Sequence, residues 1–441
     1  MGTEVEKEGR LMQQLKPQTL RRNFSWTFAG NVVYTACQWG MLVVLAKLGS
    51  PEMVGQFTLG IAITTPIIMF TNMHLRSVQI TDTKNEFLFS DFLGLRLLSS
   101  GLALLAIAAI TIVTGYRLET SIVILAIGFA KAFESISDVF YGLSHQQEQM
   151  DRIARSLMIK GPLSLLLLGL GVYLTSSVVW GAVGLAVAWA LVLLYYDIRS
   201  GVFILSKTLP PKSSVAAALQ PRWHGKTLRK LIWLALPLGF VTMLISLNTN
   251  IPRYFVERYL GERELGIFAA IAYLMVAGQI VVGALADSAS PRLAKYYAGG
   301  NIKGFCSLLL KLVGIGGLLG GLAVLVAAVA GRPLLTLVYR PEYAQQAGIL
   351  VWLMVAAGIG FVGSFLGYAV TAARYFRIQI PLFCLAAVVS AIGCQWLIPI
   401  YGLQGAAIAL IITASVQLIL IVAVLLYALH RLNRYAQPTS P

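Results

Sequence analysis

The chain is a succession of long apolar stretches separated by short polar intervals. About 20 consecutive apolar residues suffice for a helix to cross a bilayer, whereas the strands of a membrane barrel alternate apolar and polar positions. The apolar runs here are continuous, so we predict membrane-spanning helices. We place twelve of them at residues 24–46, 54–75, 92–114, 120–142, 156–175, 178–198, 231–252, 265–288, 306–330, 345–369, 378–397 and 403–428.

A polar interval, residues 199–230, separates two halves that resemble each other. Residues 48–57 (LGSPEMVGQF) are echoed by residues 260–268 (LGERELGIF), and residues 181–188 (GAVGLAVA) by residues 402–409 (GLQGAAIA). Both echoes lie at an offset of roughly 210 to 220 residues, and internal repeats of this kind are typical of secondary transporters. The alternative is chance recurrence of small residues in apolar helices.

The pattern therefore predicts an all-α polytopic membrane protein with about 12 transmembrane helices in two pseudo-symmetric six-helix bundles. The predicted parts are a cytoplasmic tail (1–23), an N-terminal bundle (24–198), a basic cytoplasmic hinge (199–230), a C-terminal bundle (231–429) and a second cytoplasmic tail (430–441). Composition agrees, because 58% of the residues are hydrophobic and only 12% are charged, against about 25% charged residues in soluble proteins. A mean hydropathy of +0.77 excludes a sizeable soluble domain.

The net charge of +16 raises the question of nucleic-acid binding. Most of the 34 Lys and Arg side chains fall on the side of the two termini. This bias predicts that both termini and the hinge are cytoplasmic. Topology and contact with anionic membrane lipids explain the basic excess, so we do not expect nucleic acid as a partner.

A cluster of ionisable residues interrupts the fourth predicted span. Lys131, Glu134 and Asp138 fall within about 60° of arc on one face of a helix. A charge in the membrane interior costs about 2.5–3.5 kcal/mol or more, so such groups normally face a cavity or a partner. One interpretation is a water-lined wall, where Lys131 meets an anionic substrate and the two carboxylates take up protons or a cation. The other is a ladder of charges that neutralise one another.

Two other spans of the first half carry polar groups that suit a glycan or a phosphate. Asn31 and Gln38 lie on one face of the first span, where amides can bind sugar hydroxyls or simply hold helices together. Arg76 and Arg96 lie near the cytoplasmic ends of the second and third spans. A guanidinium group binds phosphate through two parallel hydrogen bonds, and the alternative is that both side chains extend to the lipid headgroups.

In the second half, Asn248, Asn250 and Arg253 precede an outer loop, and we assign them to the substrate-facing set. Asp287 is a third candidate for ion coupling. The alternative for Asp287 is an ion pair with Arg292 at the end of its helix.

The motifs of the common enzyme classes are absent from the sequence. It has no phosphate-binding Walker loop, no dinucleotide-binding glycine pattern on a strand, no GxSxG and no metal-spaced His/Cys cluster. Four histidines leave few candidates for a general base. We therefore predict no enzymatic activity, no catalytic residue, no metal and no cofactor, and expect energy from a gradient, the substrate or another protein.

Several short motifs resemble those of bacterial polysaccharide flippases. They are LAKLG at 45–49 with EMVGQF at 52–57, LRSVQ at 75–79 followed by Asp82, LVYRPEY at 337–343 and PIYGLQGAA at 399–407. Taken together they resemble the O-antigen or capsule translocase branch of the multidrug/oligosaccharidyl-lipid/polysaccharide exporter superfamily, over essentially the whole chain.

The resemblance implies two bundles around a central cavity in the bacterial cytoplasmic (inner) membrane. It implies that an undecaprenyl-pyrophosphate-linked oligosaccharide is turned from the inner to the outer leaflet by alternating access, with polysaccharide polymerase machinery as a candidate partner. A cationic cavity is expected, which fits Arg76, Arg96 and Lys131. Glu134 and Asp138 depart from a purely cationic cavity and leave coupling to a proton or to sodium open.

Two alternative functions make different demands on the sequence. A drug or organic-cation antiporter of the same superfamily requires a mainly acidic, aromatic cavity, and the arginines near the spans argue against it. A membrane polysaccharide polymerase or ligase requires a large outer loop with catalytic Arg or His, whereas the longest predicted outer loop is residues 331–344.

Overall fold

The computed structural model describes residues 19–82, 86–209, 214–375 and 378–436, and all regular elements within these ranges are helices. Most of the predicted tail 1–23 and the last five residues of the tail 430–441 lie outside the described residues. Ten of the described helices are long and apolar enough to cross a membrane. The predicted all-α membrane fold is confirmed, and the protein is a multi-pass membrane protein.

Two further features bring the number of membrane-length segments in the described ranges to twelve. Helix α6 (Leu118–Gln146) is not among the ten, but its 29 residues exceed the length that a bilayer requires. Helix α17 (Gln379–Ala436) contains two helices that meet at Gly402, whose φ of 57° and ψ of −136° interrupt the helical backbone. The interruption lies between the two spans predicted at 378–397 and 403–428.

The chain divides into two compact units, Met1–Ser246 and Leu247–Pro441, and the boundary lies inside one helix, α11. The first unit holds α2 (Leu20–Leu48), α3 (Pro51–Asn72), α4 (Leu75–Thr81), α5 (Phe89–Thr114), α6, α7 (Met150–Thr175), α8 (Val178–Val192), the π-helical turn η1 (Leu193–Asp197), α9 (Ile198–Thr208), α10 (Val215–Leu219) and the first part of α11 (Gly225–Leu260). The second holds the rest of α11, α12 (Glu262–Tyr273), α13 (Met275–Ala298), α14 (Ile302–Val338), α15 (Pro341–Ala344), α16 (Ala347–Ala372) and α17. The division at residues 199–230 stays a prediction.

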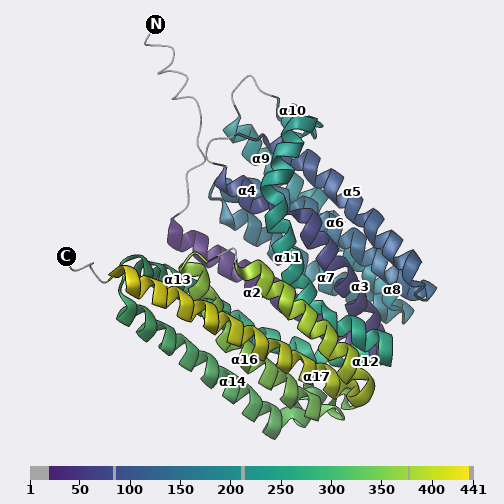
Figure 1. The fold of residues 1–441 in the computed structure, drawn as a ribbon. Helices are drawn as coiled ribbons and strands as arrows, with labels where there is room; N and C mark the ends of the chain where they lie inside the picture. The colour runs from purple at the N-terminus through teal and green to yellow at the C-terminus, as the bar shows by residue number, and fades with distance from the viewer. Residues whose placement is uncertain (1–18, 83–85, 210–213, 376–377, 437–441) are drawn as a thin grey trace, which may run out of the picture. The chain divides into compact units, whose positions relative to one another are not determined.

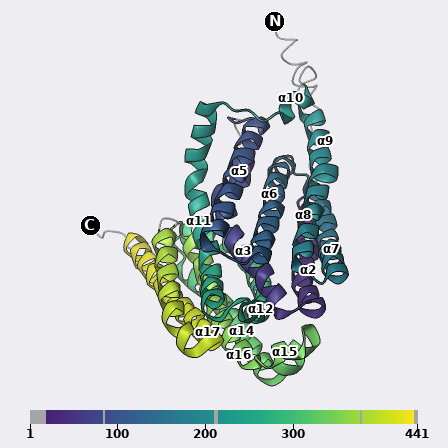
Figure 2. The ribbon, with the colours of Figure 1, turned by 90° about the vertical axis from the view of Figure 1, so that its right-hand side faces the viewer.

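In the first unit α6 packs against α3, α5 and α8, while α2 packs against α7 (Figure 2). Small residues allow these close approaches. A side chain at Gly184 of α8 would collide with the Leu167 carbonyl of α7, and one at Gly142 of α6 would collide with Gln79 of α4. The obstacle at Gly184 is backbone, so glycine is required there, whereas a side chain at Gly142 would displace the Gln79 side chain.

The chain turns sharply between α3 and α4, where Met73 and His74 both adopt left-handed backbone conformations with φ of 48° and 51°. Non-glycine residues rarely adopt this conformation. The first part of α11 supports the turn, since Thr242 donates a hydrogen bond to the Met69 carbonyl at 3.2 Å and Gly239 lies against Met73. The turn places α4 beside α6.

In the second unit α14 and α16 pack closely where Gly320 faces Gly358. The two segments of α17 run antiparallel, with Gly393 against Ala409 and Gly405 against the Leu397 carbonyl (Figure 1). Gly405 thus makes the same kind of contact as Gly184, its counterpart in the sequence echo. A shared packing role supports reading that echo as more than chance.

Candidate functional site

Two arginines and one carboxylate from three helices meet in the first unit. The Asp138 carboxylate of α6 accepts a hydrogen bond from Arg96 Nη2 of α5 at 3.1 Å and lies 3.5 Å from Arg76 Nη1 of α4. The Arg96 side chain is 0% exposed, whereas those of Arg76 and Asp138 are 32% and 27% exposed. Arg96 therefore does not extend to the lipid headgroups, and it lies beneath a partly exposed ion pair.

The end of α3 and the packing of α4 position these arginines. Because α3 stops at Asn72, its last carbonyls lack helical partners, and Arg96 Nη1 donates to the Asn72 carbonyl at 3.3 Å and contacts the Asn72 side chain. The negative end of the α3 dipole also favours this guanidinium. Gln79 lies one turn after Arg76 and packs against Gly142, which holds α4 on α6.

A second ion pair lies one to two turns earlier on α6. Lys131 Nζ donates to Glu134 Oε2 at 2.9 Å, and the Tyr34 hydroxyl of α2 donates to Glu134 Oε1 at 2.8 Å. Lys131 Nζ also lies 5.1 Å from the ring centroid of Trp189 on α8, within the range of a cation–π interaction. The charges predicted on one face of α6 thus neutralise each other only in part, since Asp138 pairs with arginines of other helices.

A third ionisable group lies on α7. Lys160 falls inside this helix, within the span predicted at 156–175, and its side chain is 1% exposed. Lys160 Nζ donates to the Tyr141 hydroxyl at 3.0 Å and lies 3.9 Å from Asp197 Oδ2, in the π-helical turn. Ser156 connects Tyr141 and Asp197. Its hydroxyl lies 2.7 Å from the Tyr141 hydroxyl and donates to Asp197 Oδ1 at 2.6 Å.

The sequence analysis did not identify Tyr34, Tyr141, Lys160 or Asp197 as site residues. One signal was present: a lysine inside a 26-residue apolar helix is costly and therefore informative. A tyrosine in an apolar span carries no such signal, because tyrosine rings also pack in apolar cores.

These groups form one network, which we call the charged network. Its ionisable members among the described residues are Arg76, Arg96, Lys131, Lys160, Glu134, Asp138 and Asp197. With four cations and three carboxylates, the network carries an excess of one positive charge. Because some of its members are partly exposed, an anion can reach it, and the low dielectric of its surroundings strengthens that attraction.

The two amides predicted on α2 differ in their contacts. Asn31 is exposed, and its Nδ2 donates to the Thr27 carbonyl of its own helix at 2.9 Å. Gln38 is half-buried, one turn beyond Tyr34, and its side chain forms a hydrogen bond with the Tyr34 hydroxyl. Helix α2 therefore reaches the charged network through the Tyr34 hydroxyl.

The candidates in the second unit form a separate group. Asn248 Nδ2 donates to the Phe383 carbonyl of α17 at 3.0 Å, and Arg253 Nη1 donates to Oδ1 of the buried Asn250 at 2.9 Å. Asp287 is exposed on α13 and forms a hydrogen bond with the Tyr368 hydroxyl of α16, and no ion pair joins it to Arg292 in the described part of the chain. The roles of these residues in substrate binding and ion coupling stay predictions.

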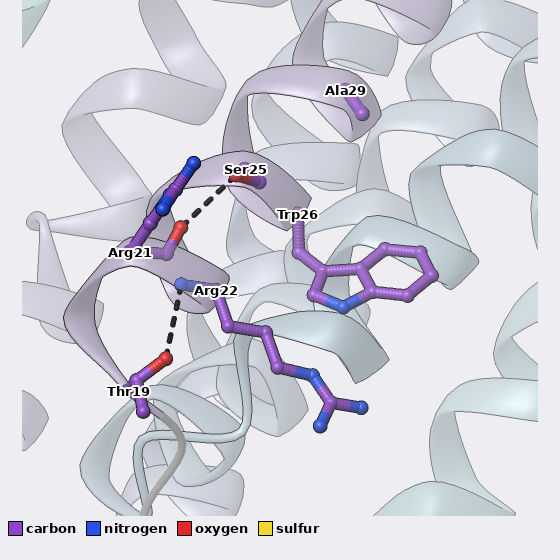
Figure 3. A pocket seen from close by; sticks show the side chains of 6 residues that line it. All are labelled: Thr19, Arg21, Arg22, Ser25, Trp26 and Ala29. Atoms are coloured by element: carbon purple, nitrogen blue, oxygen red, sulfur yellow. Dashed lines mark hydrogen bonds between the residues drawn. The ribbon is translucent and has the colours of Figure 1, made fainter.

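A surface pocket of about 460 Å³ lies at the start of α2 (Figure 3). It is lined by Thr19, Arg21, Arg22, Ser25, Trp26 and Ala29. Arg22 and Trp26 extend to the same side of the helix, as their spacing of four residues requires (Figure 3). The Arg155 guanidinium of α7 lies 5.5 Å from the Trp26 ring centroid. Guanidinium groups beside an indole suit a phosphate-bearing group at a membrane interface.

Comparison with known proteins places the chain in a family. Residues 20–297 match the family described as "Polysaccharide biosynthesis protein". The chain belongs to this family. It is also 30% identical over 413 residues to the "Capsular polysaccharide biosynthesis protein CapF" of Staphylococcus aureus, covering 90% of this chain and 97% of that one. The resemblance drawn from the sequence motifs is confirmed.

Solved structures agree on the fold. An inward-facing multidrug resistance MATE family transporter of the MOP superfamily matches with a TM-score of 0.71 at 12% identity, covering 94% of this chain and 100% of that one. The lipid II flippase MurJ in an inward closed conformation matches with a TM-score of 0.68 at 12% identity, covering 93% and 90%. At such low identity these likenesses establish the fold alone.

Proposed function

We propose that this protein is a transporter that turns a lipid-diphosphate-linked oligosaccharide from the inner to the outer leaflet by alternating access, for polysaccharide export. The observation that carries the proposal is the charged network within membrane-spanning helices, with its excess of positive charge and its partly exposed Arg76 and Lys131. Membership of the polysaccharide biosynthesis family supports a glycan-bearing substrate rather than a drug.

The carboxylates of the network have a definite place in this mechanism. Without substrate, Asp138 accepts from Arg96 and faces Arg76, while Glu134 accepts from Lys131. A diphosphate carries charge of the same sign as these carboxylates and competes for the same donors. As the diphosphate binds Arg76 and Lys131, Asp138 and Glu134 each lose one cationic partner while keeping Arg96 and Tyr34, and the loss of a cation favours proton uptake by a carboxylate.

The direct test uses the purified full-length protein in liposomes. The substrate is a fluorescent short-chain prenyl diphosphate disaccharide, and movement between leaflets is read as protection from a membrane-impermeant quencher. We expect protein-dependent flipping, and at least a tenfold lower rate for the double variant Arg76→Gln/Lys131→Gln. Lys230→Gln is the matched control, because Lys230 forms an exposed ion pair with Glu86 outside the network.

Flipping at the same rate in empty liposomes, or in the double variant, would contradict the proposal. Proton- or sodium-driven movement of an organic-cation dye, with no movement of the lipid, would favour the antiporter alternative. In cells, loss of the protein should leave a prenyl-linked glycan in the cytoplasmic leaflet, whereas glycan export that continues normally would argue against a flippase.

A further inference from the structure

We propose that Lys160 and Asp197 form a buried positioning pair, which holds Arg76 and Lys131 at a set separation and so makes the site prefer a diphosphate to a monophosphate headgroup. The inference rests on the proposed function and deepens it. It assigns a role to residues that lie behind the predicted binding residues.

The first argument is the burial of this pair. The side chains of Lys160 and Asp197 are each 1% exposed, and Asp197 Oδ2 lies 3.9 Å from Lys160 Nζ. A buried ion pair of this kind is rarely a net gain in stability over apolar residues of similar size. Its presence inside a membrane unit therefore calls for a functional reason.

The second argument is a polar stripe on α7 that fixes two aromatic rings. Ser156, Lys160 and Ser164 follow one another at intervals of four residues, so they share one helix face. Lys160 and Ser156 both bond the Tyr141 hydroxyl, at 3.0 and 2.7 Å. Ser164 accepts a hydrogen bond from Trp189 Nε1 at 2.8 Å and donates to the Lys160 carbonyl at 2.6 Å. The Tyr141 and Trp189 rings are thus both held by the turns around Lys160.

The third argument is that each ring is shared by Lys160 and one partly exposed cation. Lys160 Nζ lies 5.2 Å from the Tyr141 ring centroid and 5.8 Å from that of Trp189. The Arg76 guanidinium lies 5.6 Å from the Tyr141 centroid, and Lys131 Nζ lies 5.1 Å from the Trp189 centroid. Lys160 is therefore the common neighbour of the two rings that Arg76 and Lys131 contact.

Selectivity follows from this arrangement. A diphosphate presents two phosphoryl groups at a fixed separation, so its affinity is highest when Arg76 and Lys131 are held at a matching separation. A monophosphate binds one cation, so its affinity falls little when the other cation moves. Asp197 supports the arrangement by balancing the Lys160 charge, and its position depends on the π-helical turn Leu193–Asp197, a local irregularity that often marks functional sites.

The test compares the full-length protein in nanodiscs with the double variant Lys160→Met/Asp197→Asn, which removes both charges and leaves no buried ion unpaired. The measurement is the ratio of Kd values for a prenyl monophosphate and the matched prenyl diphosphate. We expect the wild type to prefer the diphosphate, and the double variant to lose about tenfold of this preference. Lys230→Gln/Glu86→Gln removes an exposed ion pair from the same unit and should keep the wild-type ratio.

A second variant keeps the test decisive if the double variant folds poorly. Tyr141→Phe retains the ring but removes the hydroxyl that Lys160 and Ser156 bond, and we expect it to lower the preference while the protein stays folded, with a small fall in melting temperature. An unaltered Kd ratio in the well-folded variants would overturn the positioning role, as would a wild type that binds both lipids equally. A wild type that binds neither lipid would instead refute the proposed function.

Discussion

Replacing Asp138 by Asn is the sharpest test of the idea that carboxylates stand in for the substrate. The change keeps the shape of the side chain and removes one negative charge from between Arg76 and Arg96, which lie 3.5 Å and 3.1 Å from its oxygens. Two effects of opposite sign are expected. Stability falls because buried Arg96 loses its charged partner, while affinity for an anion rises because Arg76 is no longer neutralised.

Both magnitudes can be worked from the geometry. A phosphate bound on the far side of the Arg76 guanidinium would lie about 7 Å from Asp138, where two unit charges repel by about 2 kcal/mol at an effective dielectric of ~20. Because Arg76 and Asp138 are each about a third exposed or less, solvent screening reduces this to about 1–2 kcal/mol, or roughly 5- to 30-fold in Kd. The stability loss is about 1–3 kcal/mol, since Arg96 keeps its bonds to Asn72.

The assay is equilibrium binding of a prenyl diphosphate to Asp138→Asn in nanodiscs, together with a thermal melt of the same sample. Tighter binding with a lower melting temperature is expected, and Glu86→Gln, which removes an exposed carboxylate from an ion pair with Lys230, should change neither by much. Weaker or unchanged binding in a folded sample would refute the reasoning, because it would mean that Asp138 either contacts the substrate favourably or lies away from it.

Three further outcomes follow from the same contacts. Lys131→Ala should lower the flipping rate about tenfold without loss of expression. Lys131 is a partly exposed cation, and its ion pair in the described part of the chain is with Glu134 of the same helix. Gly142→Val should lower the free energy of unfolding by about 1–3 kcal/mol, measured by thermal melt, because the new side chain would collide with Gln79. Arg22→Gln should weaken the binding of phosphatidylglycerol to the detergent-solubilised protein by about 1 kcal/mol, because the start of α2 loses one of the cations that line its pocket.

Each of these predictions has an outcome that would contradict it, and two have a matched control variant. Unchanged flux in Lys131→Ala would remove this residue from the site. Gly101→Val on α5 adds the same side chain where no atom lies within reach, so an equal effect there would mean that the Gly142 contact is unimportant. Arg199→Gln removes an exposed arginine away from the pocket, and an equal loss of lipid binding would show that only overall charge matters.

Much of the fold follows from the sequence alone. The length of each apolar run predicts a membrane span because the energy of removing a helix from water depends mainly on its own residues. The helical period likewise places Lys131, Glu134 and Asp138 on one face, and they do face one side of α6 together. The sequence does not distinguish glycines that pack from those that do not: Gly320 of α14 lies against Gly358, while a side chain at Gly317 of the same helix would meet no described atom.

Only the tertiary structure decided which of these charges meet. Asp138 bonds Arg96, 42 residues away in the chain, because the turn at Met73 and His74 and the packing of α4 and α5 on α6 bring both arginines to it. Lys160 falls inside the predicted span 156–175, but no local pattern indicates that it meets Tyr141 of α6 and Asp197 of the π-helical turn. Pairing between distant residues depends on which helices contact each other. A local pattern of apolar and polar positions does not determine those contacts.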